Sequence, residues 1–314
     1  MVNQMPTLEL LVPTYNREKM LNKFLSHHLP ICKELNVSIT IFDNCSPDET
    51  KNVVSKYMPK YKSVLRYIFC QKHITSYEIN LLALNNHKAD YAWIVGDSYK
   101  ISDALMQKVI DLLNKQPDQI VCNLNDIIPT SCSAININYI GITSCLGVTV
   151  FSSETVCKYL DCIFSKSFPQ TNLMLSSSAS SPRNTFFISN PSLEMLDFQH
   201  RSVAKNKHWT ETDRVYDILS DWVELVDCFS DHLGKKNIPS AYRSFGNVSG
   251  LTKIRGIMKM RAFGVISIYK VLNNKQLFSK VSVVPLCLMM GICLIPEKIA
   301  NHMYHISLKL RKII

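Results

Sequence analysis

Strand and helix patterns alternate through the first 125 residues, and this alternation restricts the fold more than any other feature of the sequence. Short apolar or β-branched runs, typical of buried strands, recur between segments whose apolar residues follow a helical period. The predicted strands are 7–12, 37–42, 64–69, 91–95 and 119–124, and the predicted helices are 18–29, 48–58, 77–87 and 103–115. Strands that alternate with helices favour a mostly parallel sheet with helices on both faces. We therefore expect an α/β fold.

The basic charge is confined to the end of the chain. The net charge is +10, but the residues from Leu251 onward contain eleven Lys or Arg and one acidic residue, Glu297, so residues 1–250 are neutral overall. A nucleic-acid-binding protein more often spreads basic charge over its folded body. We expect no nucleic-acid partner, and we divide the chain into a body, 1–250, and a basic helical tail, 251–314.

The tail also contains the most apolar run of the sequence, VSVVPLCLMMGICLI at 281–295. Fifteen helical residues span about 22 Å, which is shorter than a hydrocarbon core of about 30 Å. Pro285 and Gly291 weaken a spanning helix further. We expect a membrane-surface or re-entrant element, and the alternative is a helix buried against the body. Each Lys or Arg near an anionic lipid surface contributes about 1 kcal/mol to binding, so the charge of the tail favours the first reading.

Cysteine usage and the N-terminal sequence both favour a cytoplasmic location. The eleven cysteines show no C-x-x-C motif and no zinc-type spacing, which is typical of free thiols in a reducing compartment. The sequence MVNQMPTLELLVP does not resemble a signal peptide. With the basic tail, these features predict a peripheral protein on the inner face of the cytoplasmic membrane. In the middle of the chain, 175–184 is Ser-rich and predicts a loop, and 213–229 predicts a helix.

Polar residues follow three of the predicted strands. Pro13-Thr14-Tyr15-Asn16 ends the first strand, Asp43-Asn44 the second and Gly96-Asp97 the fourth. Ligands of an open parallel sheet bind beyond the carboxyl ends of its strands, although each of these residues alone is also an ordinary turn residue. The sequence has neither G-x-G-x-x-G after the first strand nor G-x-x-x-x-G-K-[ST]. A bound nucleotide would therefore be held by side chains, with or without a metal.

Four motifs in this order carry a family resemblance: LLVPTYNRE, IFDNCSPDET, Asn80 within SYEINLLALNN, and YAWIVGDSY. Together they resemble the donor half of a family 2 glycosyltransferase of the GT-A fold, most of all the bacterial O-antigen and capsule sugar transferases. The resemblance covers about residues 7–125. It implies a Rossmann-like GT-A domain with a nucleotide-sugar donor half at 1–125 and an acceptor half at 126–250.

The resemblance also implies a role for each motif residue. Pro13, Thr14, Tyr15 and Asn16 would shape the first loop against the nucleobase and ribose. Asp43, with Asn44 beside it, would accept a hydrogen bond from a ring N–H of the base, and Asn80 would support the floor of the donor site. Asp97 would contact the ribose or, through Mg²⁺ or Mn²⁺, the diphosphate, because hard cations bind carboxylate oxygens and stabilise charge on the leaving group.

The sequence departs from the family pattern at the metal. The fourth strand of these transferases ends in Gly-Asp-Asp-Asp, whereas Ser98 and Tyr99 follow Asp97 here. Tyrosine is a poor ligand for Mg²⁺ near neutral pH. The metal would be held by Asp97 and the diphosphate alone, or be absent, and Lys100 or a basic residue of 200–207 would then neutralise the phosphates.

A second departure concerns the catalytic base, which must accept the proton of the attacking hydroxyl group. Gln170, Thr171 and Asn172 align with the position where a Glu-Asp pair is usual. Glu211 and Asp213 are candidate substitutes, although two acids in this position are also typical of a helix N-terminus.

Two functional hypotheses follow. The first is an inverting hexosyl- or deoxyhexosyltransferase that moves a sugar from a nucleotide-sugar donor to a lipid-linked oligosaccharide acceptor in lipopolysaccharide O-antigen or capsule biosynthesis. The second is a degenerate, non-catalytic domain that binds a sugar nucleotide or assists assembly, because both expected carboxylate motifs are altered.

Overall fold

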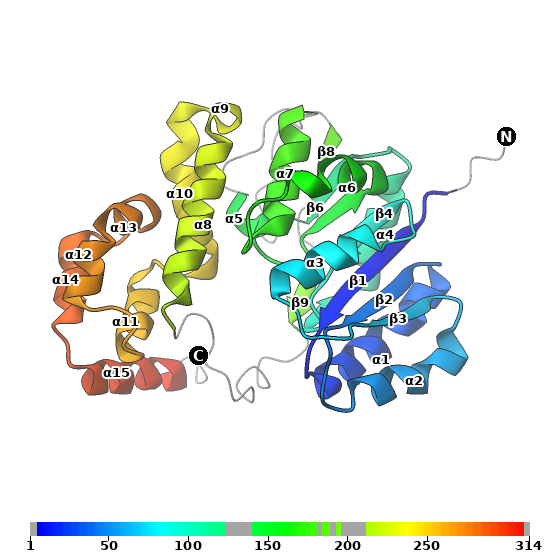
Figure 1. Cartoon of the computed structure of the whole chain (residues 1–314), viewed down its shortest axis with the longest axis horizontal. Helices are drawn as coiled ribbons and strands as arrows, with labels where there is room; N and C mark the ends of the chain where they lie inside the picture. Colours follow the sequence, from blue (N-terminus) through cyan, green and yellow to red (C-terminus); the bar gives the residue numbers. More distant parts are fainter. Residues whose placement is uncertain (1–4, 123–139, 181–183, 189–192, 196–211, 311–314) are drawn as a thin grey trace. The chain divides into compact units, whose positions relative to one another are not determined.

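The computed structural model describes residues 5–122, 140–180, 184–188, 193–195 and 212–310. The chain divides into two compact units, which are described separately (Figure 1). The N-terminal unit consists of 1–135 and 143–201, and the C-terminal unit consists of 136–142 and 202–314. This boundary differs from the expected division at residue 250.

Among the described residues of the N-terminal unit, seven strands form one sheet in the order β3-β2-β1-β4-β7-β6-β8. Strand β7 is antiparallel to β4 and β6, and the pairs β1–β2, β2–β3, β1–β4 and β6–β8 are parallel. Strands β5 and β9 form a separate antiparallel pair. The strands are β1 (Leu8–Thr14), β2 (Ser38–Asp43), β3 (Leu65–Phe69), β4 (Tyr91–Ile94), β5 (Tyr99–Ile101), β6 (Gln119–Cys122), β7 (Thr149–Ser152), β8 (Thr185–Ile188) and β9 (Leu193–Met195). The predicted mostly parallel sheet is confirmed.

Helices cover both faces of this sheet (Figure 1). Helices α1, α2 and α4 contribute to one hydrophobic core, while α3, α6 and α7 pack against one another on the other face. These helices are α1 (Glu18–Glu34), α2 (Thr50–Tyr61), α3 (Ser76–Asn85), α4 (Asp103–Leu113), α6 (Ser153–Tyr159) and α7 (Pro169–Ser180), with a 3₁₀ turn at Leu160–Cys162. Because the helices alternate with strands along the chain, the loops at the carboxyl ends of β1, β2 and β4 remain free for a ligand.

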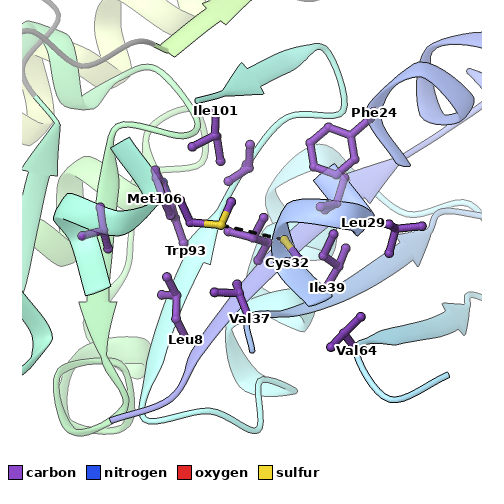
Figure 2. Packing of buried hydrophobic residues seen from close by; sticks show 14 of the residues in the cluster. Leu8, Phe24, Leu29, Cys32, Val37, Ile39, Val64, Trp93, Ile101 and Met106 are labelled. Carbon is purple, nitrogen blue, oxygen red and sulfur yellow. Dashed lines mark hydrogen bonds between the residues drawn. The ribbon is translucent and has the colours of Figure 1, made fainter. Parts of the chain in front are cut away.

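The larger core lies between the sheet and α1, α2 and α4. Alternate residues of each strand point into it, as the two-residue period of a strand requires, and Leu8 of β1 and Trp93 of β4 are among them. Figure 2 shows Phe24 and Cys32 of α1 in this cluster with Met106 of α4, whose Sδ lies 3.9 Å from the Cys32 Sγ. This contact places α1 and α4 over the same face of the sheet.

An ion pair between the buried Glu9 carboxylate and the partly exposed Arg66 ties the strands together on the opposite face. The Glu9 carboxylate of β1 accepts hydrogen bonds from the Thr40 hydroxyl of β2, from Arg66 Nη2 of β3 at 2.9 Å and from the backbone N–H of Lys88 at 2.6 Å. Arg66 Nη2 also donates to the Asn86 carbonyl at 2.9 Å. A carboxylate that is 1% exposed is stable only with such partners. The network therefore fixes the register of β1, β2 and β3.

The Ser-rich segment is not the predicted loop. Helix α7 continues through it to Ser180, and residues 181–183 lie outside the described residues. The Ser178 hydroxyl donates to the Met174 carbonyl at 2.7 Å, one helical turn earlier. This bond satisfies a buried polar side chain inside the helix, so the low helix propensity of serine is overridden.

The C-terminal unit is helical within its described residues. Its helices are α8 (Arg214–Cys228), α9 (Ser230–Leu233), α10 (Ile238–Ser249), α11 (Ile254–Ala262), α12 (Ile268–Asn273), α13 (Lys275–Val281), α14 (Leu286–Cys293) and α15 (Glu297–Leu310), with a 3₁₀ turn at Lys235–Asn237. Helix α5 (Ile140–Thr143) belongs to the C-terminal unit up to Ile142. The predicted helix at 213–229 and the helical character of the tail are confirmed.

Helices on both sides of residue 250 belong to one packed assembly, which explains the different boundary. Helix α13 packs against α8 and α10, and Lys280 Nζ of α13 lies 3.3 Å from Asp227 Oδ2 of α8. The Trp222 and Phe245 rings of α8 and α10 lie 5.4 Å apart in the interior. Charge composition separates residues 251–314 from the body, but packing places them with residues 212–249.

No single helix in the described part of the chain is both long and apolar enough to cross a bilayer. Helices α13 and α14 together meet the length and hydropathy needed, but the pair is bent by 117°. Within the apolar run, Met289 and Ile292 are buried, while Val283, Leu288 and Leu294 are exposed. The run is therefore partly core and partly surface.

Candidate functional site

The carboxyl ends of β1, β2 and β4 meet at one edge of the sheet, because these strands are adjacent and parallel. The Asn44 N–H donates to the Thr14 carbonyl at 2.9 Å, and the Thr14 hydroxyl donates to Asp97 Oδ2 at 2.8 Å. Pro13, half-buried, is the penultimate residue of β1. The structure therefore brings the three predicted strand-end motifs together.

Asp97 is one of two buried carboxylates at this edge. It is 1% exposed, and its Oδ1 lies 2.6 Å from Arg17 Nη1, whose side chain is 40% exposed. Burial raises the pKa of Asp97, and the opposing effects of the Arg17 charge and the Thr14 hydrogen bond reduce that shift. Both carboxylate oxygens of Asp97 thus accept a hydrogen bond from within the protein.

Asp43 forms the second buried carboxylate of the edge. Its Oδ1 accepts from the backbone N–H of Ser46 at 2.9 Å, and its Oδ2 accepts from the Tyr67 hydroxyl at 2.6 Å. Burial, followed by the hydrogen bond to Asp43, raises the pKa of Tyr67, so the phenol stays protonated and donates. Each carboxylate oxygen has a second lone pair, which leaves acceptor capacity for a ligand N–H.

The loops after β1, β2 and β3 form one connected rim, made of Tyr15, Asn16, Asn44, Ser46 and His73. The Asn44 side-chain amide donates to the Ile74 carbonyl at 2.8 Å and accepts from its N–H at 2.9 Å. The Tyr15 and His73 ring centroids lie 4.1 Å apart, and the Asn16 N–H donates to Ser46 Oγ at 2.9 Å. Asn16 has a φ of 53°, a left-handed conformation in which asparagine is enriched.

Asn80 lies on α3, which packs against β1 and β4. It is 8% exposed, and its side-chain amide forms no hydrogen bond to the described residues. The helix is fixed at its start by a reciprocal capping box between Thr75 and Glu78. Asn80 is therefore a buried amide with free hydrogen-bonding capacity on a well-anchored helix.

The strand after Asp97 is held by two histidines of α1. Tyr99 begins β5, and the Ile101 N–H donates to His28 Nε2 at 3.0 Å, while His27 Nε2 lies 3.2 Å from the Ile101 carbonyl. His28 Nδ1 donates to the Phe24 carbonyl at 2.8 Å. Burial lowers the pKa of His28 to about 3, so the ring is neutral. The two histidines therefore have a positioning role for β5.

The donor set at Asp97 does not fit a divalent cation. Mg²⁺ and Mn²⁺ require several oxygen ligands at about 2.0–2.6 Å, yet a guanidinium nitrogen already lies 2.6 Å from Oδ1 and the Thr14 hydroxyl donates to Oδ2. Tyr99 stands where the family has a carboxylate. Among the described residues no group of three or more His, Cys, Asp or Glu side chains is arranged to hold a metal.

The base candidates lie elsewhere. Glu211 is outside the described residues, and Asp213 precedes α8 in the C-terminal unit, where it lies 2.7 Å from Lys270 Nζ. In α7, Asn172 Oδ1 accepts from the backbone N–H groups of Phe164 and Ser165, so this side chain fixes a turn. The assignment of the base stays a prediction.

The aligned residues before Asn172 are equally enclosed in the N-terminal unit. Gln170 Nε2 donates to the Ser144 carbonyl at 2.9 Å, and its Oε1 is buried without a hydrogen bond among the described residues. Thr171 Oγ1 accepts from Thr143 Oγ1 at 3.2 Å. An amide and a hydroxyl do not act as a general base near neutral pH, so these positions support folding.

Arg17 is the site residue that sequence reasoning missed. It occurs in the quoted motif LLVPTYNRE, but neither composition nor spacing shows that its side chain turns back to Asp97, 80 residues away. The signal that could have indicated Arg17 is its position, because it is a basic residue between a strand-end loop and the start of a helix.

Comparisons with known proteins agree with this geometry. Residues 9–134 match the model of the family described as Glycosyl transferase family 2. No curated protein sequence matches the chain. This region is therefore similar to glycosyl transferase family 2, and the predictions of a glycosyltransferase and of a GT-A-like fold are confirmed.

Solved structures resemble the fold at low sequence identity. TarS residues 1–349 from S. aureus in complex with UDP-GlcNAc match with a TM-score of 0.57 and 13% identity, covering 91% of this chain and 90% of that one. The mannosyltransferase PcManGT from Pyrobaculum calidifontis, in complex with GDP-Man and Mn²⁺, matches with a TM-score of 0.53 and 12% identity, covering 93% and 88%. At these identities the likeness establishes the fold.

Proposed function

We propose that this domain transfers a hexose or deoxyhexose, with inversion, from a nucleotide-sugar donor to a lipid-linked saccharide acceptor in O-antigen or capsule synthesis. The observation that carries the proposal is the convergence of Thr14, Asp43 and Asp97 at the carboxyl edge of a parallel sheet. The donors bound by TarS and PcManGT, UDP-GlcNAc and GDP-Man, are both nucleoside diphosphate sugars and support the donor class.

The rim suits a nucleobase and ribose. Tyr15 is 40% exposed and its ring contacts that of His73 at an interplanar angle of 42°, so it offers a partly preformed surface for a base. Asp43, on the neighbouring strand end, keeps lone pairs that can accept a hydrogen bond from a ring N–H, and Asn44 acts indirectly by hydrogen bonding to the Ile74 backbone. In this arrangement Asp97 accepts a hydrogen bond from a ribose hydroxyl.

The transfer step breaks one bond and forms one. The acceptor hydroxyl oxygen attacks the anomeric carbon, the bond from that carbon to the diphosphate oxygen breaks, and its electron pair leaves with the nucleoside diphosphate. The hydroxyl proton passes to a base, for which Glu211 and Asp213 are the candidates. Attack from the face opposite the leaving group inverts the anomeric configuration.

A lipid-linked acceptor and a peripheral location on the inner face of the cytoplasmic membrane are supported by the surface of the C-terminal unit. Large apolar side chains are exposed along its later helices: Ile254, Ile268, Tyr269, Leu272, Val283, Leu288, Leu294, Ile299, Met303 and Ile306. A cavity of about 410 Å³ combines Ile254, Val283 and Leu288 with Lys253 and Arg255. Apolar contacts and basic charge together favour an anionic lipid surface.

The experiment that tests the proposal measures binding and transfer in the full-length protein. A panel of UDP-, GDP- and dTDP-sugars is screened for protection against thermal unfolding, and the protective donors are assayed with membranes that contain the native lipid-linked acceptor. We expect Asp97→Ala to abolish transfer. Lys62→Ala is the matched control, because this exposed residue directly follows α2 at the amino edge of the sheet.

The proposal is wrong if no donor protects the protein, or if Asp97→Ala transfers sugar at the wild-type rate. Transfer with retention of anomeric configuration, measured by NMR of the product, would refute the inverting mechanism while leaving the donor class intact.

A further inference from the structure

We propose that Arg17 takes the place of the divalent cation in the donor site, so that the protein binds the diphosphate of its donor without a metal. This inference rests on the proposed nucleotide-sugar function. It follows from the donor set at Asp97, where the Arg17 guanidinium lies 2.6 Å from the carboxylate oxygen Oδ1.

The orientation of Arg17 leaves it able to bind a second anion. Its Nη1 donates to Asp97 Oδ1 at 2.6 Å, whereas its Nε and Nη2 form no hydrogen bond to the described residues. Arginine presents five N–H donors in a planar fork, which suits bidentate contacts with phosphate oxygens. Because the side chain is 40% exposed, these remaining donors are accessible from solvent.

Asp97 and Thr14 hold the guanidinium in place. Asp97 is almost completely buried at the end of β4, and its second oxygen accepts from the Thr14 hydroxyl, so the carboxylate has little freedom to rotate. An arginine fixed by such an ion pair loses less conformational entropy when a ligand binds. Asp97 is therefore a positioning residue for Arg17 as well as a contact for ribose.

The position of Arg17 in the fold adds to its charge. It is the N-cap residue of α1, a helix of 17 residues, and the Leu21 N–H donates to its carbonyl. The positive end of this helix dipole favours an anion. Two acidic groups lie nearby: Asp48 Oδ2 accepts from the Glu18 N–H, and Glu18 Oε2 accepts from the Glu49 N–H. Both carboxylates are thus engaged by backbone donors.

A cation at the same place is disfavoured by the surrounding side chains. To reach Asp97 it would have to displace a guanidinium of the same sign of charge. The side chain at the usual second ligand position is the Tyr99 phenol, which lacks the carboxylate oxygens that hard cations prefer. Arg17 therefore supplies the charge-assisted hydrogen bonds that would otherwise come from a metal.

The test measures nucleotide binding by calorimetry in the absence of acceptor. Wild-type protein and the variants Arg17→Ala, Arg17→Lys and Lys62→Ala are titrated with a nucleoside, its monophosphate and its diphosphate, each in EDTA and in Mn²⁺. The base is the one selected in the donor screen. We expect equal diphosphate affinity of the wild type in EDTA and in Mn²⁺.

The variants distinguish phosphate binding from a structural role. Arg17→Ala should weaken diphosphate binding about tenfold or more, and nucleoside binding much less, because the lost contacts are to phosphate. Arg17→Lys keeps the charge beside Asp97 but lacks the fork, so it should fold like the wild type and lose part of the diphosphate affinity. Lys62→Ala should match the wild type throughout.

Two results would overturn the inference: a tenfold or greater loss of wild-type diphosphate affinity in EDTA, or an equal loss of nucleoside and diphosphate affinity in Arg17→Lys. Both differ from failure of the proposed function, in which neither nucleoside nor diphosphate binds at all. Adding a carboxylate with Tyr99→Asp in the Arg17→Ala background should create Mn²⁺-dependent diphosphate binding, which gives a positive control for metal detection.

Discussion

Mild acid should destabilise the N-terminal unit through His28. The ring accepts a hydrogen bond from Ile101 and donates one to Phe24, so it must be neutral in the native state. Its pKa is lowered from 6.5 to about 3 by burial, with smaller contributions from His27 and Lys100. In the unfolded chain the same ring binds a proton below pH 6.5. Stability is therefore fully present above that pH and is lost progressively as the pH decreases toward 3.

The expected magnitude follows from linkage. Between pH 7 and pH 5 the His28 ring becomes mostly protonated in the unfolded state but not in the native state. This difference lowers the free energy of unfolding by about 2 kcal/mol. Other groups titrate in the same range, so the quantity to measure is a difference between variants. His28→Gln should be less stable than the wild type at pH 7, and its stability should change by about 2 kcal/mol less between the two pH values.

Urea unfolding followed by tryptophan fluorescence at pH 7, 6 and 5 measures this difference. Trp93 reports on the N-terminal unit because it lies in the core beside α1 and α4. His302→Gln, at an exposed position on α15, is the control and should keep the wild-type slope. Equal pH dependence of the unfolding free energy in His28→Gln and wild type would refute the reasoning. It would mean that protonation of His28 in the unfolded state does not cause the loss of stability.

Two further predictions concern the surface and the core. The double variant Ile254→Glu/Leu288→Glu should no longer float with phosphatidylglycerol vesicles, because both changes put charge on the exposed apolar surface. Val248→Glu changes an exposed residue on α10 of the same unit and should leave flotation unchanged. Unchanged flotation of the double variant would exclude this surface as the membrane contact. Phe24→Ala should lower the unfolding free energy by about 3–5 kcal/mol in urea unfolding, because it removes a fully buried ring, and a loss below 1 kcal/mol would contradict the packing.

The parallel sheet was predictable because the period of each element is local. The spacing of Met20, Phe24 and Leu25 indicates a helix, and residues 37–42 indicate a strand, without knowledge of their partners. The helical end of α7 was not predictable, since the hydroxyl of Ser178 is satisfied only by a bond inside the folded helix.

The candidate site was predictable in part for a related reason. Thr14 and Asp43 end β1 and β2, and Asp97 lies in the loop after β4, so parallel pairing alone brings them to one edge. Arg17, Tyr67 and the two histidines of α1 act through contacts between distant segments, which have no local pattern. The compact units differ from the division at residue 250 because charge composition does not report helix packing such as that between α13 and α8.

The connected rim has a consequence for how a ligand selects this site. Hydrogen bonds and a ring contact already join the loops of the rim, so a shift of one loop would disturb its contacts with the others. Binding a base that fits costs little conformational entropy, because the loops are already ordered. A base that does not fit cannot be accommodated by moving one loop alone. Under the proposed function, discrimination between bases is thereby set in the unliganded protein, and so is the position of the Arg17 guanidinium, which Asp97 holds for the phosphates.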